Sequence, residues 1–326
     1  MNSFFNKSVL LATGLALCAC DADTEDFDYI DDDGHESVED VENRGGGGGG
    51  GGIKLNTNKQ GAKLFSAING LFKEYNHTEL TSVRLSFGEI EADCVHVWAK
   101  EGELFCRDDK GVIHNGWQFL DSIWKMQLDG DSVQLTIAEM NHNGSEYLYR
   151  FNDLASGPDK MPTCDEDPDQ PGTFWSVVLD NVDFDKDGKM FDVSDIVYLA
   201  CTSGSIGKTV DMMGVSPWEH GPKAYQAGIY MTMLSPCGNA DSLTIPGTPL
   251  RVMDSMGVNS WGPGFPMDSE GVWDTDGMVC SGKKLRTDWL TEEIDCGGYK
   301  IPICDETELK TLYYTEPDVV FWTKPA

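Results

Sequence analysis

Eight cysteines between positions 94 and 304 constrain the fold of this chain more than any other feature of its sequence. They are Cys94, Cys106, Cys164, Cys201, Cys237, Cys280, Cys296 and Cys304. No two of them have CxxC spacing and none lies beside a His at ligand spacing, so a zinc site is not indicated. An even number of cysteines in an exported chain predicts a set of disulfides. The expected pairs are Cys94–Cys106 and Cys296–Cys304; the pairing of the other four stays open.

The first twenty residues indicate export. Lys7 supplies a short positive region, and the apolar run SVLLATGLAL is about ten residues long, too short for a transmembrane helix. The run ends in LCAC, which resembles a bacterial lipobox. We predict that residues 1–20 are a lipoprotein signal peptide and that Cys20 becomes the acylated first residue of the mature chain. The alternative is an ordinary signal peptide cleaved nearby.

Residues 21–52 have the composition of a tether. They are mostly acidic and end in an unbroken run of glycines, Gly45 to Gly52. Such a segment cannot bury enough apolar surface to fold, and oligoglycine behaves as a flexible coil. We therefore predict a disordered linker between the lipid anchor and a folded body; a metal-buffering acidic tail is the alternative.

Charge restricts the partners of this chain. Fifty-five Asp and Glu residues against 24 Lys and Arg residues give a formal net charge of -31. This charge argues against nucleic acid as a partner, because phosphate binding relies on patches of Lys and Arg. No second apolar run is long enough to cross a membrane. The expected location is the bacterial cell envelope, facing the periplasm or the cell surface, with the membrane contacted through the lipid.

Residues 53–170 show mostly the alternating pattern of strands. WKMQLDGDSVQLTI contains two such runs around Asp129-Gly130, a strong hairpin signal. CVHVWAKEGELFC is similar and turns near Glu101-Gly102, which would place Cys94 and Cys106 together at the open end of the hairpin. This part is therefore predicted to be a β-rich meander of hairpins.

Residues 171–290 combine strands with helices. IVYLAC reads as an apolar strand, whereas SIGKTVDMMG and PKAYQAGIYMTML have helical spacing. The predicted fold class is α+β: a β-rich N-terminal part followed by a small disulfide-linked part with two short helices. Residues 291–326 are expected to form a C-terminal extension.

The tripeptide Gly207-Lys208-Thr209 matches the end of a phosphate-binding P-loop. The first Gly of that pattern is Thr202 here, and an exported protein meets essentially no ATP. We predict no bound nucleotide. Gly204 and Gly207 are better explained by a strand-to-helix turn and by close packing of the helix.

Four segments carry a family resemblance: LACTSGSIGKTVDMMGVSPW, YQAGIYM, CGNADSLTIPGT and EGVWDTDGMVC. Together they resemble the ADYC domain, a bacterial domain of unknown function found in exported proteins. The residues that match the family pattern are Cys201, Gly204, Lys208, Gly214, Pro217, Trp218, Cys237, Gly238, Ser242, Thr244, Gly247, Thr248, Trp273, Gly277 and Cys280. The clear resemblance covers residues 174–286.

The departures from the family pattern also carry information. The four letters that name the family are Leu234-Ser235-Pro236-Cys237 here, so only the Cys remains. Thr209 and Gly228 stand where the family typically has Cys, and losing both together is what a disulfide between the two helices would predict. Leu243 stands where the family often has His, so a catalytic role for that His does not apply to this chain.

An acidic segment resembles the start of a calcium loop. Asp183, Asp185 and Asp187 alternate before a Gly, as carboxylates that converge on calcium do, but Ser194 occupies the place of the final Glu. A solvated acidic turn between two strands is the simpler interpretation. Calcium is the only cofactor that the sequence suggests.

No catalytic set stands out. His220 follows Cys201 and suggests a Cys–His pair, but a disulfide is the expected state of that cysteine. Trp124, Trp175, Trp218, Trp261 and Trp273 suggest a carbohydrate platform or, more simply, core residues.

We therefore expect a lipid-anchored, non-enzymatic binding or structural module with an unknown envelope or extracellular partner. The alternatives are an envelope hydrolase with a site near Trp218, His220 and Thr244, and a calcium-dependent adhesion or sensing module.

Overall fold

Alternating apolar and polar residues fill the first half of the folded chain, and they form strands. In the strand IWKMQL, for example, Trp124 and Met126 are buried while Lys125 between them is exposed. The computed structural model describes residues 54–55, 68–69, 74–75, 77–142, 146–156, 161–167, 170–261 and 268–326. All of these belong to one compact unit, Glu42–Ala326. The predicted signal peptide, Cys20 and the whole predicted tether lie outside the described residues.

Most strands join one large antiparallel sheet, whose order is β2-β12-β11-β10-β9-β8-β4-β5-β6-β7, with β3 paired to β4. The strands are β2 (Ile68–Asn69), β3 (Glu74–Tyr75), β4 (Thr78–Phe87), β5 (Ile90–Lys100), β6 (Glu103–Asp108), β7 (Ile113–Asn115), β8 (Ile123–Leu128), β9 (Asp131–His142), β10 (Tyr147–Asp153), β11 (Ser176–Phe184) and β12 (Met190–Cys201). Both predicted hairpins are confirmed, as β5–β6 and β8–β9.

The large sheet curls around its own core. The β4–β5 ladder ends at the pair Arg84–Asp93, and a bulge follows between Cys94 and His96. A bulge bends its strand and increases the local twist. Past this bulge β5 contacts β11 and β12, which are distant from it in the order of the sheet. Residues from both ends of the sheet consequently share one hydrophobic core.

A second antiparallel sheet holds the C-terminal part. Its order is β1 (Lys54–Leu55), β13 (Pro249–Asp254), β18 (Phe321–Pro325), β14 (Gly271–Asp274) and β15 (Gly277–Ser281). A short hairpin, β16 (Ile294–Asp295) with β17 (Lys300–Ile301), follows β15 in the chain. The last strand, β18, lies between β13 and β14, so residues beyond 290 complete this sheet rather than forming a separate appendage.

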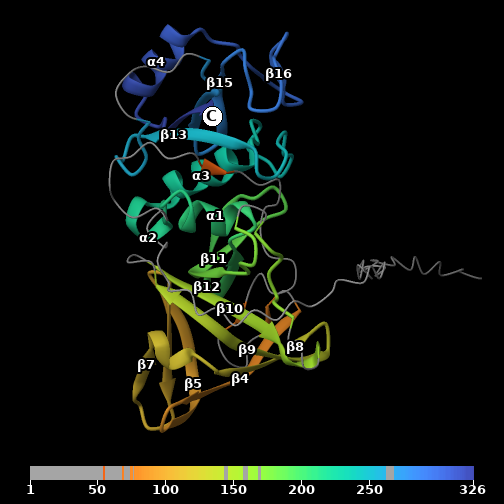
Figure 1. Cartoon of the computed structure of the whole chain (residues 1–326), viewed down its shortest axis with the longest axis vertical. Helices are drawn as coiled ribbons and strands as arrows, with labels where there is room; N and C mark the ends of the chain where they lie inside the picture. Colours follow the sequence, from red (N-terminus) through yellow and green to blue (C-terminus); the bar gives the residue numbers. More distant parts are fainter. Residues whose placement is uncertain are drawn as a thin grey trace, which may run out of the picture. The chain divides into compact units, whose positions relative to one another are not determined.

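Three helices lie between the two sheets (Figure 1), and another covers the second sheet. The helices are α1 (Ser205–Asp211), α2 (Pro217–His220), α3 (Pro222–Met233) and α4 (Glu306–Thr315), with short 3-10 turns at η1 (Gly116–Phe119) and η2 (Leu154–Ser156). The two predicted helices are α1 and α3. The sequence analysis missed α4, although its N-cap Asp305 and Glu308 form a capping box, a signal readable from sequence.

Two glycines allow the helices to pack closely. A Cβ on Gly207 of α1 would lie 2.4 Å from the carbonyl oxygen of Cys201, and a Cβ on Gly228 of α3 would lie 2.6 Å from Cγ2 of Thr209. The role predicted for Gly207 in helix packing is thus confirmed. Thr209 and Gly228, the two positions where the family typically has Cys, face each other across the α1–α3 contact. This is the arrangement that a helix-to-helix disulfide requires.

We expect the double substitution Thr209→Cys with Gly228→Cys to form a further disulfide, because the new Sγ at position 209 would lie beside the new Cβ at position 228. The bond should raise the free energy of unfolding by about 2–4 kcal/mol. Intact mass under non-reducing conditions and thermal unfolding check both effects. The control Gly228→Ala should instead cost about 1–3 kcal/mol through overpacking. Two alkylatable thiols in the oxidised double variant would contradict the prediction.

The described cysteines between positions 94 and 304 form four disulfides: Cys94–Cys106, Cys164–Cys201, Cys237–Cys296 and Cys280–Cys304. The predicted pair Cys94–Cys106 is confirmed, at the open end of the β5–β6 hairpin. The predicted pair Cys296–Cys304 is wrong.

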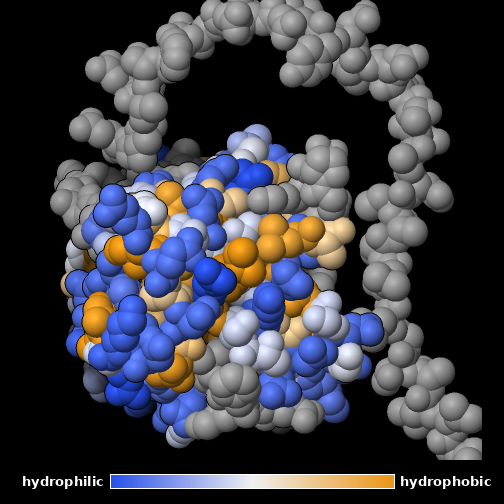
Figure 2. Space-filling view, turned by 90° about the horizontal axis from the view of Figure 1, so that it is seen from below, coloured by the Kyte–Doolittle hydropathy of each residue, from blue (hydrophilic) through white to orange (hydrophobic). Residues whose placement is uncertain are grey.

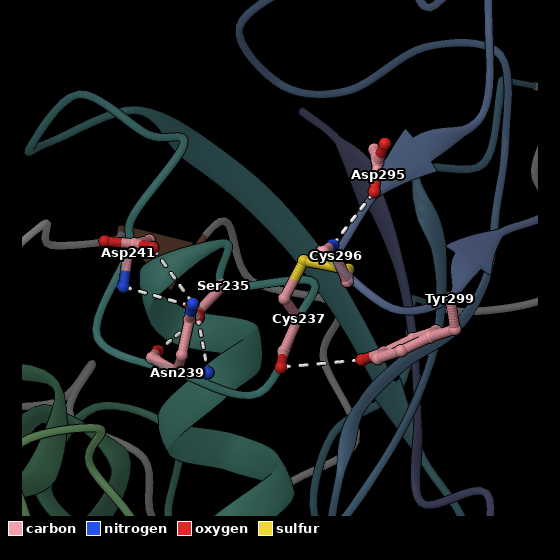
Figure 3. Close-up of a disulfide and its surroundings, with 8 residues drawn as sticks. Ser235, Cys237, Asn239, Asp241, Asp295, Cys296 and Tyr299 are labelled. Carbon is pink, nitrogen blue, oxygen red and sulfur yellow. Dashed lines mark hydrogen bonds between the residues drawn. A yellow bond between two sulfur atoms is a disulfide. The ribbon is translucent and has the colours of Figure 1, made fainter.

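The reason lies in how the chain leaves the β16–β17 hairpin. The N–H of Cys304 donates to the carbonyl of Ser281 at 2.8 Å, which places Cys304 beside the end of β15 and its Cys280. Cys296 instead lies at the β16–β17 turn, facing the loop after α3, where the hydroxyl of Tyr299 donates to the carbonyl of Cys237 at 3.5 Å (Figure 3). The prediction of Cys296–Cys304 rested on closeness in the sequence, and that closeness does not hold in the fold.

The structure confirms the predicted α+β class. The β-rich part comes first, and the later part combines helices with strands (Figure 1) and holds disulfides. Disulfides of this number are typical of proteins from an oxidising, extracellular or exported environment. None of the helices in the described part of the chain has the length and apolar character needed to span a bilayer.

Candidate functional site

The tripeptide that resembles a P-loop is part of the scaffold. Nζ of Lys208 donates to Oδ1 of Asp167 at 2.9 Å, and both side chains are almost completely buried. The hydroxyl of Thr209 donates to the carbonyl of Ser205, one helical turn earlier, at 2.7 Å. The two side chains that would contact phosphate in a P-loop are therefore engaged inside the protein.

A second buried ion pair holds the C-terminal sheet to α3. Nε of Arg286 donates to Oε1 of Glu270 at 2.8 Å, and both side chains are fully buried. Thr323 donates to Glu270 and accepts from the indole N–H of Trp273. Nη2 of Arg286 also donates to the carbonyl of Met231, near the end of α3. The network connects β14, β18 and α3 and is closed to solvent.

The segment that resembles a calcium loop forms the turn between β11 and β12. Asp183 is buried and accepts a hydrogen bond from the hydroxyl of Tyr75 at 2.7 Å. Asp185 accepts from the N–H of Asp187, whose carboxylate pairs with Lys186. Across the described residues, no three His, Cys, Asp or Glu side chains are grouped as a metal site requires. The three predicted ligands, Asp183, Asp185 and Asp187, do not converge.

A pocket of about 490 Å³ lies where the curled sheet brings β5 against β11 and β12. We call it the seam pocket. The polar and aromatic side chains that line it are His96, Trp98, Lys100, Arg107, Asp180, Asn181 and Asp195. Its position follows from the strand pattern: Val97 and Ala99 point into the core, so the residues that alternate with them face outward. Pockets of this size accommodate small ligands.

The polar side of the seam pocket is shaped by an irregularity in the β11–β12 ladder. The register shifts between Asp180 and Val182, where Asn181 and Asp195 take left-handed backbone conformations with φ of 54° and 61°. Asn and Asp tolerate this region better than other non-glycine residues. Oδ1 of Asn181 accepts from the N–H of Asp195 at 2.7 Å, and its Nδ2 donates to Asp180 at 2.8 Å. Carboxyl and amide groups are thereby held together at the pocket.

Burial raises the pKa of Asp180, while the hydrogen bond from Asn181 acts in the opposite direction. Burial dominates because removing water disfavours the charged form of a carboxyl. Carboxyls with raised pKa values in a pocket are frequent at functional sites.

A second pocket, of about 680 Å³, lies at the turn of the β5–β6 hairpin. We call it the hairpin pocket. Its lining includes Lys100, Glu103, Phe105, His142, Tyr147 and Trp218. Burial raises the pKa of Glu103, against the effects of a hydrogen bond from Asn115 and the charge of His142. Lys100 lines both pockets, so the two lie at neighbouring ends of one surface.

The residues proposed for a hydrolase site are not gathered in either of these two pockets. Trp218 lines the hairpin pocket, but neither His220 nor Thr244 is among the described residues that line it. Nδ1 of His220 accepts from the N–H of Ser216 at 3.2 Å. Cys201 is bonded to Cys164, so it cannot act as the nucleophile of a Cys–His pair.

Comparison with known proteins identifies the family. A family model described as the ADYC domain matches residues 116–287, more than half of the 326 residues. The chain belongs to the ADYC domain family. The match begins well before the segment where the resemblance is clear by eye, and so takes in β8 to β10. No curated protein and no solved structure matches the chain.

The ADYC pattern residues build the scaffold of this ADYC domain. The three cysteines of the pattern, Cys201, Cys237 and Cys280, are in disulfides. Lys208 is in a buried ion pair, and Trp273 is fully buried. A Cβ on Gly238 would lie 2.0 Å from the carbonyl oxygen of Asp276, and one on Gly277 would lie 2.4 Å from that of Pro236. These two glycines thus let two turns of the domain touch.

Of the residues that line the two pockets, the sequence pointed to Trp218 of the hairpin pocket but not to Trp98 of the seam pocket. Trp124 and Trp273, which the sequence also singled out, are core residues. The sequence did contain a sign of Trp98. In HVWAK, the residues alternate between the core and the outer face, and Trp98 is an aromatic residue at an outward position between the polar residues His96 and Lys100. The partners on β11 and β12 carry no such signal.

Proposed function

We propose that this protein is exported, is held at a bacterial envelope membrane by a lipid on Cys20, and acts as a non-enzymatic binding module. The observation that carries the binding role is the pair of open pockets joined by Lys100 on the β5–β6 hairpin. The disulfides support export, because such bonds persist in oxidising compartments.

Binding fits the site better than catalysis. The cysteines of the family pattern are in disulfides and its lysine is in a buried ion pair, so none of these side chains is available as a nucleophile. The pockets combine aromatic rings with carboxylates, an amide and a lysine, which is a surface suited to recognition.

The lower face of the molecule also favours a small ligand over a permanent protein partner. On the face drawn in Figure 2, the described hydrophobic residues lie in small patches separated by hydrophilic ones. Permanent protein interfaces bury broader and more apolar surfaces.

Metabolic labelling with a fatty-acid probe tests the anchor. We expect the label on the full-length chain and its loss in Cys20→Ala, because the thiol of Cys20 is the predicted acylation site. The matched control is Cys18→Ala, which removes the neighbouring thiol and should keep the label. Label that persists in Cys20→Ala, or an unlabelled wild-type chain in the soluble fraction, would refute the anchor.

A further inference from the structure

A ladder of three aromatic rings crosses the outer face of the β5–β6 hairpin. His96 and Trp98 stack with their ring centroids 5.2 Å apart, and Trp98 stacks on Phe105 at 5.5 Å with the planes 14° apart. Trp98 and Phe105 are directly opposite each other in the ladder between the two strands. All three side chains are half-buried, so parts of each ring remain accessible to solvent. Aromatic residues on the outer face of a sheet need a reason beyond core packing.

This ladder joins the two pockets. Trp98 lines the seam pocket, Phe105 lines the hairpin pocket, and Lys100 lines both. Because Trp98 and Phe105 are in stacking contact, aromatic side chains extend without a break from one pocket to the next. The combined surface is therefore elongated and suits a chain-like ligand better than a compact one.

Polar groups that bind hydroxyls flank the ladder at both ends. Asp180 and Asn181 hold a carboxylate and an amide side by side at the seam pocket. Glu103 and His142 lie at the hairpin pocket. Carboxylates and amides each offer two hydrogen-bonding atoms, a geometry that matches pairs of neighbouring hydroxyls on a sugar ring.

We infer that this surface binds a neutral oligosaccharide, with sugar units in both pockets and the Trp98–Phe105 ladder between them. Sugars present apolar C–H faces to aromatic rings and hydroxyls at their edges, which is the mixture that this surface offers. In the seam pocket the carboxylates of Asp180 and Asp195 are balanced by Lys100 and Arg107. In the hairpin pocket three glutamates face one lysine. This excess of carboxylates and the chain's formal net charge of -31 disfavour anionic glycans and nucleic acids. The inference rests on the proposed binding role, and it names the ligand class for the same site.

Calorimetry with defined oligosaccharides tests the inference. The protein is the full chain carrying Cys20→Ala, and the probes are β-1,4-linked hexaoses of glucose, mannose and xylose, their bioses, and hexagalacturonate as an anionic control. We expect at least one neutral hexaose to bind, more tightly than its biose. Trp98→Ala should weaken that binding by about tenfold or more, because a lost ring contact and its buried area account for such a change.

Two further variants make the test specific. Trp98→Phe keeps an aromatic ring and should retain most of the affinity, which guards against a Trp98→Ala protein that is merely misfolded. Trp289→Ala removes a tryptophan that is 60% exposed and lines neither pocket, and it should leave the affinity unchanged. An equal loss of affinity in Trp98→Ala and Trp289→Ala would overturn the proposed location.

The outcomes separate the two proposals. If the wild-type chain is labelled on Cys20 but the Cys20→Ala protein binds none of the neutral hexaoses, the oligosaccharide site is refuted and the lipid anchor stands. If the Cys20→Ala protein binds a neutral hexaose but the wild-type chain carries no label, the anchor is refuted and the oligosaccharide site stands. Tighter binding of hexagalacturonate than of any neutral hexaose would refute the charge argument, and equal affinity for biose and hexaose would refute a site that spans both pockets.

Discussion

Replacing Gly207 with Ala is expected to lower the free energy of unfolding by about 3 kcal/mol, the upper end of the usual cost of overpacking. The added methyl would lie 2.4 Å from the carbonyl oxygen of Cys201 and 2.6 Å from that of Ala200. Both obstacles are backbone atoms at the end of β12, and Cys201 is also held by its disulfide to Cys164. Neither can move away as the end of a flexible side chain could.

Equilibrium unfolding in guanidinium chloride without reductant measures the loss for Gly207→Ala. The matched control is Gly298→Ala, because a Cβ there would meet nothing within 4 Å. That control should stay within about 0.5 kcal/mol of the wild type. A Gly207→Ala protein as stable as the control would show that α1 does not pack against the end of β12 as described.

Replacing Lys208 with Met is expected to cost about 3–5 kcal/mol, because it leaves the carboxylate of Asp167 buried without its charge partner. Nζ of Lys208 lies 2.9 Å from that carboxylate, and solvent reaches 0% and 1% of the two side chains. The double variant Lys208→Met with Asp167→Asn should recover much of the loss, since the buried side chain at position 167 then carries no charge. The same unfolding measurement checks all three proteins.

A surface pair provides the control. Lys223 and Asp318 also approach within 3.5 Å, but both side chains are 76% exposed. Lys223→Met should therefore change the stability by less than about 1 kcal/mol. If Lys208→Met were equally mild, the buried pair would not be holding the 161–167 segment to α1.

Lys208 belongs to the ADYC pattern, and Gly207 lies next to it in α1, so the structural role of both residues bears on what the pattern marks. A pattern that marks an active site places its polar side chains at a pocket, whereas here Lys208 and the three pattern cysteines are committed to the interior. Both pockets are lined on one side by the β5–β6 hairpin, which precedes the matched residues 116–287. The opposite side of each pocket is lined by residues inside the match. The family match therefore identifies a scaffold, and the ligand-binding character of this protein depends partly on residues outside it.

The sequence by itself determined the local structure of this protein. The Asp129-Gly130 and Glu101-Gly102 turns produced the expected hairpins, and helical spacing located α1 and α3, because turn chemistry and periodicity act between near neighbours. The oxidised state of the cysteines followed from their number and the export signal.

Only the tertiary structure decided which distant residues meet. Cys237 forms a disulfide with Cys296, 59 residues away, and Lys208 forms an ion pair with Asp167, 41 residues away. The seam pocket forms where β5 lies against β11 and β12. The seam pocket depends on how the large sheet curls and where its bulges bend the strands, whereas the disulfide and the ion pair depend on which distant loops lie against α3 and α1. Curl is the sum of many small twists and register shifts along the chain, so no single motif encodes it.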